Sequence, residues 1–431
     1  MSNMMNKAQG FGLSLITKIA GSEVLDQLKL RKFVEKSLYQ GSKTGFKVLN
    51  KTQKAFKPQA IDKQRLPNQV NKNLFDLSLT EEQQMTVDAM SQFAEEVLYA
   101  LAHDADHQAQ FPEQLWQHLV DLGLNYYALP EASGGVAAEQ NIVSNILIAE
   151  SLAKGDFSLT AGLLSSFSVI NAITRWGSTQ VQSMYLPVFA EDTDVTATFA
   201  FQEATPAFNP YQLKTKATEQ NGQMTITGEK TLVILGDTAD VFLVSAEFNG
   251  QPDIFVVQSN ETIAIKANPA MGLKAAETAA LHFNQTPALR LGDADFDYTA
   301  FVDLGNLMWC AMAIGTGEAI KAYCIKYANE RTAFGEPISH RQSVAFMIAD
   351  MAIEIDAMRM LVLNAASLAE AGQPFHREAY LARLLCAEKS MKIGTDGVQI
   401  LGGHGFTKEH PVERWYRDLR ATAILHSGLH A

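Results

Sequence analysis

The sequence predicts an α+β protein that is mostly helical, with an N-terminal helical domain, a middle β-domain of hairpins and a C-terminal helical bundle. Apolar residues recur at helical spacing from Leu79 to about Asp194, short β-rich runs fill 196–297, and long helical segments return from Tyr298 onward. No helix alternates with the β-rich runs, so a Rossmann-type sheet is not expected. A chain of 431 residues also needs more than one core.

The N-terminal helical domain is expected to begin at Thr80, a residue suited to an N-cap, which precedes two glutamates suited to a first helical turn. A break at Pro112 separates this helix from an amphipathic stretch over 115–124. The helical period resumes over Ile142–Ala153, and Tyr185–Pro187 closes the region.

Six short runs rich in β-branched and aromatic residues predict the strands of the β-domain. Glycines separate several of them, which is typical of tight turns between paired strands. The runs are Thr198–Phe201, Met224–Thr227, Leu232–Leu235, Val241–Val244, Ile254–Val257 and Ile263–Ile265.

Three long helical segments and a shorter last one predict the C-terminal bundle. The long segments cover about 304–329, 342–371 and 378–401. We therefore divide the chain into a basic extension, a helical domain, a β-domain and a bundle, over 1–78, 79–195, 196–297 and 298–431.

The composition is that of a globular protein, with 47% hydrophobic and 19% charged residues. Cys310, Cys324 and Cys386 have no CxxC spacing, so we expect buried, inert thiols, a reducing compartment and a cytoplasmic location. Apolar runs long enough for a membrane-spanning helix are absent from the sequence. A secretory signal is not expected either.

The net charge of −12 is spread unevenly along the chain. Residues 1–72 hold 14 Lys and Arg against 4 Asp and Glu, whereas 73–431 hold 21 against 43. The basic arm is either a solvated extension or, because 10–20 has apolar residues at helical spacing, a peripheral contact with anionic lipid or a partner. The acidic remainder would repel phosphates, so nucleic acid is not an expected ligand.

Three C-terminal motifs resemble those of the acyl-CoA dehydrogenase family. Arg331–Gly335, with Arg341-Gln342 after it, resembles R-x-x-F-G…Q. Gln399–Phe406 resembles Q-I-x-G-G-x-G-[FY], and Pro411–Asp418 resembles P-V-E-R-x-x-R-D. The resemblance covers roughly 79–431 and implies an FAD-dependent oxidoreductase that takes an acyl-CoA thioester, forms a homodimer or homotetramer, and passes electrons to an acceptor that the sequence does not identify.

The resemblance implies FAD contacts, many of them across a dimer interface. An arginine offers a planar fork of donors to a pyrophosphate, and a glycine turn lets backbone amides approach phosphate closely. The residues implied in this part of the chain are Arg331, Phe334, Arg341, Gln342, Gln399 and Gly403.

In the β-domain the resemblance is thinner. Phe199–Pro210 lies where the family has a T-E-P-x-x-G-S-D-like loop; Glu203 is kept, but Gln202 replaces the usual Thr or Ser. Leu232 and Ile234 stand where an aromatic and a hydroxyl residue normally contact the isoalloxazine. We expect Leu232 and Ile234 to leave the flavin a more apolar wall with fewer donors.

Two further residues are expected to contact substrate. Asp303 is kept where relatives use an Asp to hold the CoA moiety, and Phe208 lies in the loop that touches flavin and substrate.

The expected catalytic base is missing. Dehydrogenation removes a proton from the carbon next to the thioester, which requires a base within hydrogen-bond reach. The family Glu follows the R-D Asp by eight residues, and counting from Asp418 gives His426. Some relatives place the Glu on the long helix before R-x-x-F-G; counting back from Arg331 gives about Gly305, with Asn306 where the neighbouring Arg usually stands.

Three interpretations stay open. His426 acts as the base, since a free imidazole with a pKa near 6.5 accepts a proton at neutral pH. Alternatively, the chain binds FAD and acyl-CoA but is catalytically silent, as the inactive half of a paired oligomer. The third is a flavin-dependent monooxygenase on the same fold, which needs no carboxylate there.

Rival classes are less well supported. A pure interaction scaffold would have no reason to carry the flavin-binding motifs. His103 with His107, and His426 with His430, have the spacing of metal ligands, but neither pair is an H-E-x-x-H, and no metal site is expected. Because the family continues with another helix, we expect a truncated bundle or an incomplete sequence, with an apolar face that a partner covers.

Overall fold

The computed structural model describes residues 78–135, 142–191 and 195–431. The basic extension predicted over 1–78, including its amphipathic stretch, therefore lies outside the described residues except for Ser78.

The N-terminal part is helical, as predicted. Thr80 caps the first helix through a reciprocal pair of hydrogen bonds with Gln83, which satisfies backbone donors that the helix leaves open. We expected Tyr185–Pro187 to end this region. Instead, Tyr185 and Pro187 lie inside its last helix. The helices are α4 (Glu81–Phe93), α5 (Tyr99–Gln108), α6 (Gln114–Leu122), α7 (Leu124–Ala128), α8 (Ile142–Ala153), α9 (Phe157–Trp176) and α10 (Thr179–Glu191).

Contrary to the expectation from the sequence, helix α9 is long and apolar enough to cross a membrane. Nearly all of it is buried inside the protein, which is the setting of a core helix. Cys310, Cys324 and Cys386 are free and buried, which confirms the predicted burial of the thiols.

The β-domain forms a seven-stranded sheet in the described part of the chain. Neighbouring strands follow the order β1-β4-β2-β3-β7-β5, and β6 pairs with β7. Strand β5, at the end of this order, also pairs with β4. The β2–β3 and β4–β5 pairs are antiparallel, whereas β1 runs parallel to β4. The strands are β1 (Ala197–Ala200), β2 (Lys216–Gln220), β3 (Gln223–Val233), β4 (Val241–Phe248), β5 (Gln251–Gln258), β6 (Ile263–Ala267) and β7 (Ala279–Arg290).

The strand predicted over Leu232–Leu235 is wrong in its second half. Strand β3 ends at Val233, and its register against β7 shifts between Lys230 and Val233. Leu232 has φ of 53° and Leu235 of 50°, in the left-handed region that costs a bulky side chain about 1–2 kcal/mol. The backbone therefore leaves the sheet where the sequence suggested a flavin-facing strand.

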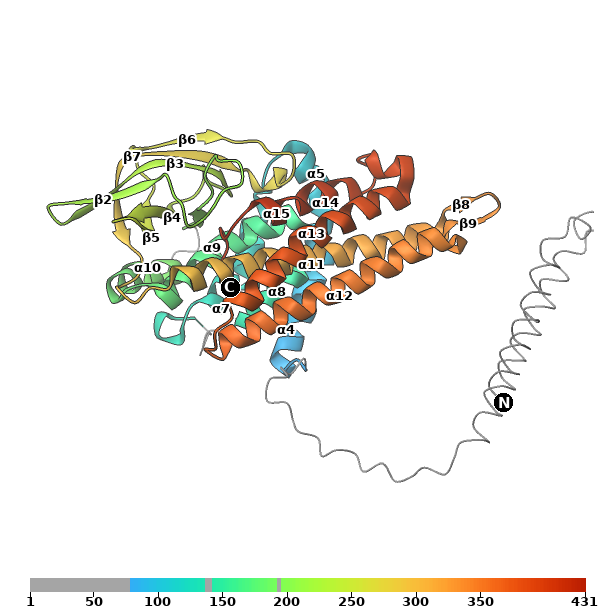
Figure 1. Cartoon of the computed structure of the whole chain (residues 1–431), viewed down its shortest axis with the longest axis horizontal. Coiled ribbons are helices and arrows are strands. Elements are labelled where there is room, and N and C mark those ends of the chain that lie inside the picture. Colours follow the sequence, from blue (N-terminus) through green and yellow to red (C-terminus); the bar gives the residue numbers. More distant parts are fainter. Residues whose placement is uncertain (1–77, 136–141, 192–194) are drawn as a thin grey trace, which may run out of the picture. The chain divides into compact units, whose positions relative to one another are not determined.

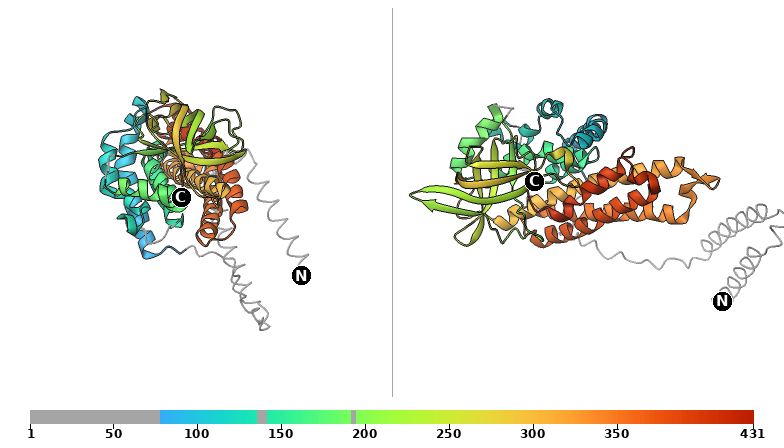
Figure 2. Two further views of the ribbon diagram at one scale, coloured as in Figure 1. Left: turned by 90° about the vertical axis from the view of Figure 1, so that its left-hand side faces the viewer. Right: turned by 90° about the horizontal axis from the view of Figure 1, so that it is seen from above.

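The C-terminal bundle contains the three predicted long helices, with bounds close to those expected. They are α11 (Tyr298–Glu330), α12 (Gln342–Glu370) and α13 (His376–Leu401), followed by the short α14 (Val412–Leu419) and α15 (Ala421–Ile424). Helix α11 packs against α8, α12 and α13. The β-domain lies at one end of these helices, and the β8–β9 hairpin (Thr332–Ala333 and Glu336–Pro337) forms the other end (Figures 1 and 2).

The P-V-E-R-x-x-R-D motif holds the last helices in place. The Arg414 Nε donates to the buried Asp156, the N-cap of α9, at 2.8 Å. Arg417 makes a two-pronged contact with Asp106, through Nη1 and Nη2 at 2.9 and 2.8 Å. Burial, and then the neighbouring Asp156, raise the pKa of Asp418 to about 8, so this carboxyl is protonated at neutral pH while Oδ1 accepts from the Leu273 amide.

Candidate functional site

His426 lies beside the residues predicted to face the flavin ring. It belongs to a segment without helix or strand, Leu425–Ala431, which we call the closing segment. A cavity of only about 10 Å³ remains where this segment meets the β-domain and α11. Its lining residues are Phe199, Phe201, Gln202, Leu232, Ile234, Trp309, Leu425, His426, Ser427 and Gly428.

The His426 imidazole is neutral at physiological pH. Burial, and then the Arg383 cation, lower the pKa of His426 to about 4. The Phe208 ring packs edge-to-face on it, with centroids 6.2 Å apart. The structure thus brings Phe208 and His426 together, and the imidazole is about as basic as a free glutamate, whose pKa is about 4.3.

Arg383 is a residue of this site that the sequence analysis missed. Its guanidinium is buried on α13, and Nη2 donates to the Leu425 carbonyl, one residue before His426. Nη1 is buried without a hydrogen-bond partner among the described residues. Arg383 therefore fixes the backbone at Leu425 and places a cation near His426. Its position in an ordinary helical pattern gave no signal of this role.

The three predicted flavin-ring contacts of the β-domain meet at the same cavity. The Gln202 amide nitrogen donates to the Ile424 carbonyl at 3.4 Å, while its oxygen is buried and has no hydrogen-bond partner among the described residues. Leu232 and Ile234 present apolar walls, as the sequence suggested. The unpaired amide oxygen could accept a hydrogen bond from a ligand in this cavity.

A buried ion pair holds the loop that carries Gln202. The Lys230 ammonium lies 3.0 Å from the Glu203 carboxylate, and both side chains are almost fully buried. Glu203 also accepts from the amides of Lys214 and Thr215, at 2.9 and 3.0 Å. Lys230 further donates to the Phe201 carbonyl and to the Ser245 hydroxyl, which links β3, β4 and the end of β1. The Glu203 of the family loop is thus a framework residue.

Asp303 is buried on α11 but does not line the small cavity. Its carboxylate lies 2.7 Å from the His376 imidazole at the start of α13. Burial raises the pKa of Asp303 to about 6, against the hydrogen bond and charge of His376. His376 was missed from the sequence, where nothing connects it to Asp303.

The other predicted FAD contacts lie at the far end of the bundle. Arg331 lines a cavity of about 360 Å³ together with the Gly402-Gly403 turn, and no carboxylate pairs with it among the described residues. Arg341, Gln342 and Gln399 are exposed on the same end, and Phe334 is 97% exposed with the Arg341 guanidinium 5.8 Å from its ring.

Helix α11 separates these two groups within one chain. Trp309 borders the small cavity, and Arg331 follows the last turn of the same helix. Twenty-two residues at about 1.5 Å each put them roughly 33 Å apart. Figure 1 shows the same separation, with the β-domain and the β8–β9 hairpin at opposite ends of the bundle. One chain therefore cannot bring both groups to a single cofactor.

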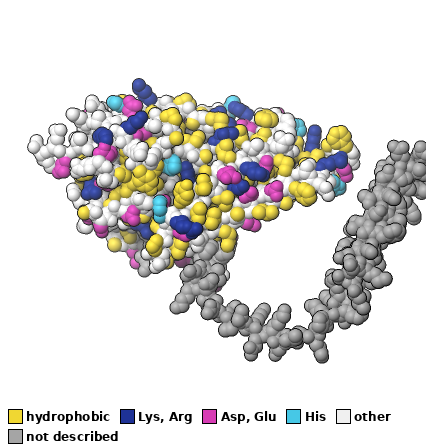
Figure 3. Space-filling model, in the orientation of Figure 1, with side chains coloured by type: hydrophobic (Ala, Val, Ile, Leu, Met, Phe, Trp, Pro, Cys, Tyr) yellow, Lys and Arg dark blue, Asp and Glu magenta, His cyan; other side chains and the backbone are white. Residues whose placement is uncertain are grey.

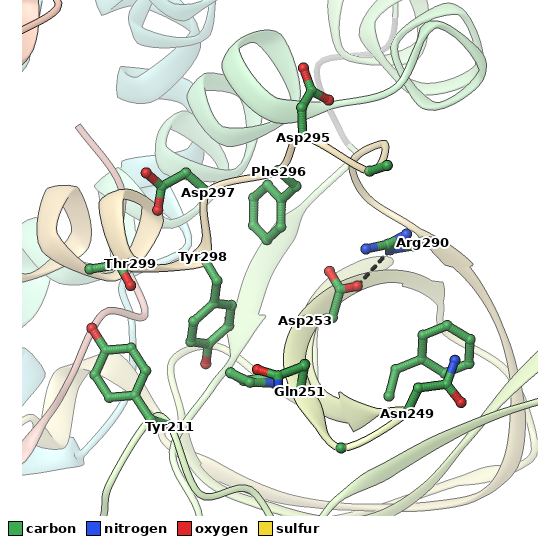
Figure 4. Close-up of a pocket in the computed structure, with 14 residues that line it drawn as sticks. Tyr211, Asn249, Gln251, Asp253, Arg290, Asp295, Phe296, Asp297, Tyr298 and Thr299 are labelled. Carbon is green, nitrogen blue, oxygen red and sulfur yellow. Dashed lines mark hydrogen bonds and ion pairs between the residues drawn. The ribbon is translucent and has the colours of Figure 1, made fainter.

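A wider hollow of about 970 Å³ lies between the β4–β5 hairpin and the start of α11. Figure 4 shows Tyr211 and Tyr298 on one side and the Asp253–Arg290 ion pair on another. Because Arg290 is paired, the two further carboxylates of Asp295 and Asp297 leave the wall acidic. Such a wall disfavours phosphate-bearing groups, and no predicted site residue lines the hollow.

Only half of an FAD site is open in this chain. At the far end of the bundle, an unpaired arginine beside a glycine turn fits a pyrophosphate. At the β-domain end, about 10 Å³ of space cannot admit a flavin ring, since it holds about one water molecule. Arg331, Gly402 and Gly403 therefore fit the phosphate part of FAD, whereas the ring part has no room in this conformation.

The two histidine pairs with metal-like spacing have other surroundings. His430 accepts a hydrogen bond from the Trp176 indole at 2.9 Å, and His426 faces Phe208. His103 and His107 lie on α5. In the part of the chain that the structure describes, no group of three or more His, Cys, Asp or Glu side chains is arranged to hold a metal.

Helical, β and helical domains in this order, with a glycine turn and an arginine at the bundle end, define a class of flavin-binding oxidoreductase. Comparison with known families agrees. The N-terminal, middle and C-terminal domains of acyl-CoA dehydrogenase match residues 80–193, 198–286 and 299–428. The chain belongs to the acyl-CoA dehydrogenase family, whose members are FAD-binding flavoproteins.

Individual relatives cover most of the chain. An acyl-CoA dehydrogenase of Bacillus subtilis is 30% identical over 365 residues, which is 81% of this chain and 95% of that protein. The short-chain specific acyl-CoA dehydrogenase of Megasphaera elsdenii has the same identity and coverage. The solved butyryl-CoA dehydrogenase from that organism superposes with a TM-score of 0.75 at 28% identity, over 82% of this chain and 96% of that chain.

Proposed function

We propose that this chain is an FAD-dependent acyl-CoA dehydrogenase in which neutral His426 takes the place of the carboxylate base. When bound, FAD would accept the hydride from the carbon β to the thioester. His426 would accept the proton from the α carbon, and Leu232 and Ile234 would form the apolar wall beside the ring. The sequence leaves the acyl chain length and the electron acceptor open.

The position of His426 carries this proposal. It lies at the cavity that the predicted ring contacts share, and its pKa of about 4 leaves it unprotonated and able to accept a proton at neutral pH. An imidazole that takes a proton becomes a cation, and burial close to Arg383 disfavours that state. We therefore expect a slower reaction than a glutamate at this position would give.

The test is spectral. The purified protein is incubated with FAD, desalted, and titrated anaerobically with butyryl-CoA while flavin absorbance is followed. Retained FAD that loses its absorbance supports dehydrogenation. A protein that stays colourless rejects the flavoenzyme, and one that retains FAD without bleaching by short, medium or branched acyl-CoA rejects the dehydrogenase.

A silent chain that binds FAD and acyl-CoA is the second candidate, because the closed cavity would keep the reacting carbons of the thioester away from His426. About 10 Å³ beside His426 leaves no room for a thioester in this conformation. Retained flavin that shifts its spectrum with acyl-CoA, but never bleaches, would identify this function.

We further propose a homodimer or homotetramer. Phe346, Ile353 and Met360 lie seven residues apart on α12 and are 62, 65 and 46% exposed. Seven residues are two helical turns, so these side chains form one apolar stripe. Tyr380 and Leu384 on α13 are exposed as well. Figure 3 shows apolar side chains among charged ones over this part of the bundle.

Ile353→Asp is expected to break this association and to reduce FAD retention, because a second chain is needed to bring the two groups of FAD contacts together. Ile353 is well exposed, so folding of the single chain should be unaffected. Light scattering after size-exclusion chromatography measures the mass. Met184→Asp on α10, also exposed, is the control. An unchanged mass and FAD content would contradict the proposed interface.

We also propose a cytoplasmic location from the free cysteines. Contact of the basic residues 1–72 with a membrane surface or a partner stays a prediction, since they lie outside the described residues.

A further inference from the structure

We propose that the end of the closing segment, Ser427–Ala431, is a displaceable plug: it occupies the space of the acyl thioester, and acyl-CoA binding requires it to leave, while the hydrogen bond from Arg383 to the Leu425 carbonyl holds the backbone next to His426 in place. This rests on the proposed function, because the ligand it excludes is the substrate of that function. The inference concerns Ser427, Leu429 and His430, which no motif of the family singled out.

Burial shows how completely the segment fills this space. Ser427 is 1% exposed, Leu429 and His430 are fully buried, and Ala431 is 3% exposed. The residual volume beside His426 is about 10 Å³. A thioester with even a short acyl chain needs several times the volume of one water molecule, so ligand and segment compete for one space.

Gly305 identifies that space as substrate space. By the family resemblance, some relatives carry their catalytic glutamate on α11 at about this position, where its carboxylate would have to reach the α carbon of the substrate. A Cβ built on Gly305 would meet the Ser427 hydroxyl at 2.4 Å and the Leu429 carbonyl at 2.6 Å. The closing segment therefore lies where a base on residue 305 would meet its substrate, and the glycine is what lets the segment approach.

Hydrogen bonds hold the segment at three points. The Trp309 indole donates to the Ser427 carbonyl, and the Ser427 amide donates to the Asn306 side chain at 3.0 Å. The Trp176 indole donates to His430 Nε2 at 2.9 Å, and the His430 ring packs on Phe301 with centroids 4.9 Å apart. The segment is thus docked between α9 and α11.

The docked state also carries costs that make it displaceable. The Ser427 hydroxyl is buried without a hydrogen-bond partner among the described residues. This atom weakens docking, because it gives up its water without a replacement. The segment belongs to no helix or strand, so its release breaks no regular structure.

Trp176→Phe tests the plug, since it keeps an aromatic ring and removes one donor to the segment. Losing one hydrogen bond raises the released population, so we expect butyryl-CoA to bind the FAD-loaded variant about fivefold tighter by calorimetry. Trp116→Phe, on α6, is the matched control and should bind like the wild type. Hydrogen exchange over 427–431 reports the plug itself and should rise when butyryl-CoA is added to the wild type.

Gly305→Ala is a second variant that does not depend on Trp176. Its methyl group would collide with Ser427 and Leu429, so exchange over 427–431 should rise even without ligand. If butyryl-CoA binds the wild type while exchange and affinity stay unchanged in every variant, the plug is rejected and the proposed function stands. If variants with a released segment bind no acyl-CoA, the proposed function itself is rejected, and the inference with it.

Discussion

Replacing Glu203 with glutamine is expected to lower the free energy of unfolding by about 3–5 kcal/mol, because it leaves the Lys230 ammonium buried without its counter-charge. Burial already lowers the pKa of Lys230 to about 8, against the pull of the Glu203 carboxylate. A glutamine also places an NH₂ group where two carboxylate oxygens accept from the Lys214 and Thr215 amides. The measurement is a denaturant titration followed by fluorescence.

Glu229→Gln supplies the control for that titration. Glu229 lies on the same strand one residue before Lys230, and its contact with His282 is exposed on both sides. Exposed pairs contribute about 0–1 kcal/mol, so this variant should unfold close to the wild type. A loss for Glu203→Gln no larger than that of the control would mean that the buried pair does not hold the loop. Glu203→Gln combined with Lys230→Met should recover much of the loss, since no unpaired charge remains.

Replacing His426 with alanine is expected to slow flavin reduction by acyl-CoA about 100-fold or more, the usual contribution of a positioned base. His426→Glu should instead react faster than the wild type, because the nearby Arg383 cation favours an ionised carboxylate and a proton transfer to it leaves a neutral acid. Stopped-flow absorbance at saturating acyl-CoA measures both rates. His118→Ala, in the N-terminal helical domain, controls for the loss of an imidazole.

The pH dependence sharpens this test. The pKa of His426 is about 4, below its unfolded value near 6.5, so the imidazole stays neutral until the pH falls toward 4. Wild-type flavin reduction should therefore be level from pH 6 to 8 and fall only below about pH 5. An alanine variant that reduces flavin at the wild-type rate would show that His426 is not the base.

The fold could be predicted from the sequence because its signals are local. Helical periods are long and capped, so the predicted ends of α12 and α13 lie within a few residues of the observed ones. The predicted start of α11 is one to two turns late. Strands β2 and β7 were missed, because the first reads as the polar run Lys216–Gln220 and the second contains Asn284, Gln285 and Pro287. Their place in the sheet is set by pairing with β3, which no local pattern reveals.

The candidate site could be predicted only in part. Motif positions brought Gln202, Leu232, Ile234 and His426 to one cavity, as expected from the family order of residues. The motifs could not predict that the residues after His426 are buried, because Ser427–Ala431 has no periodicity and contains small and polar residues. Its burial depends on contacts with residues more than a hundred positions away, such as Trp309 and Trp176.

The close approach at Gly305 constrains how this protein could change by mutation. Any larger residue there collides with Ser427 and Leu429, so a glutamate cannot be gained at position 305 while the closing segment keeps its place. If substitutions first displace residues 427–429, a larger side chain at position 305 has room. Positions 305 and 426, the two places where the family resemblance implies a base, are therefore coupled, because a carboxylate at position 305 requires a different closing segment.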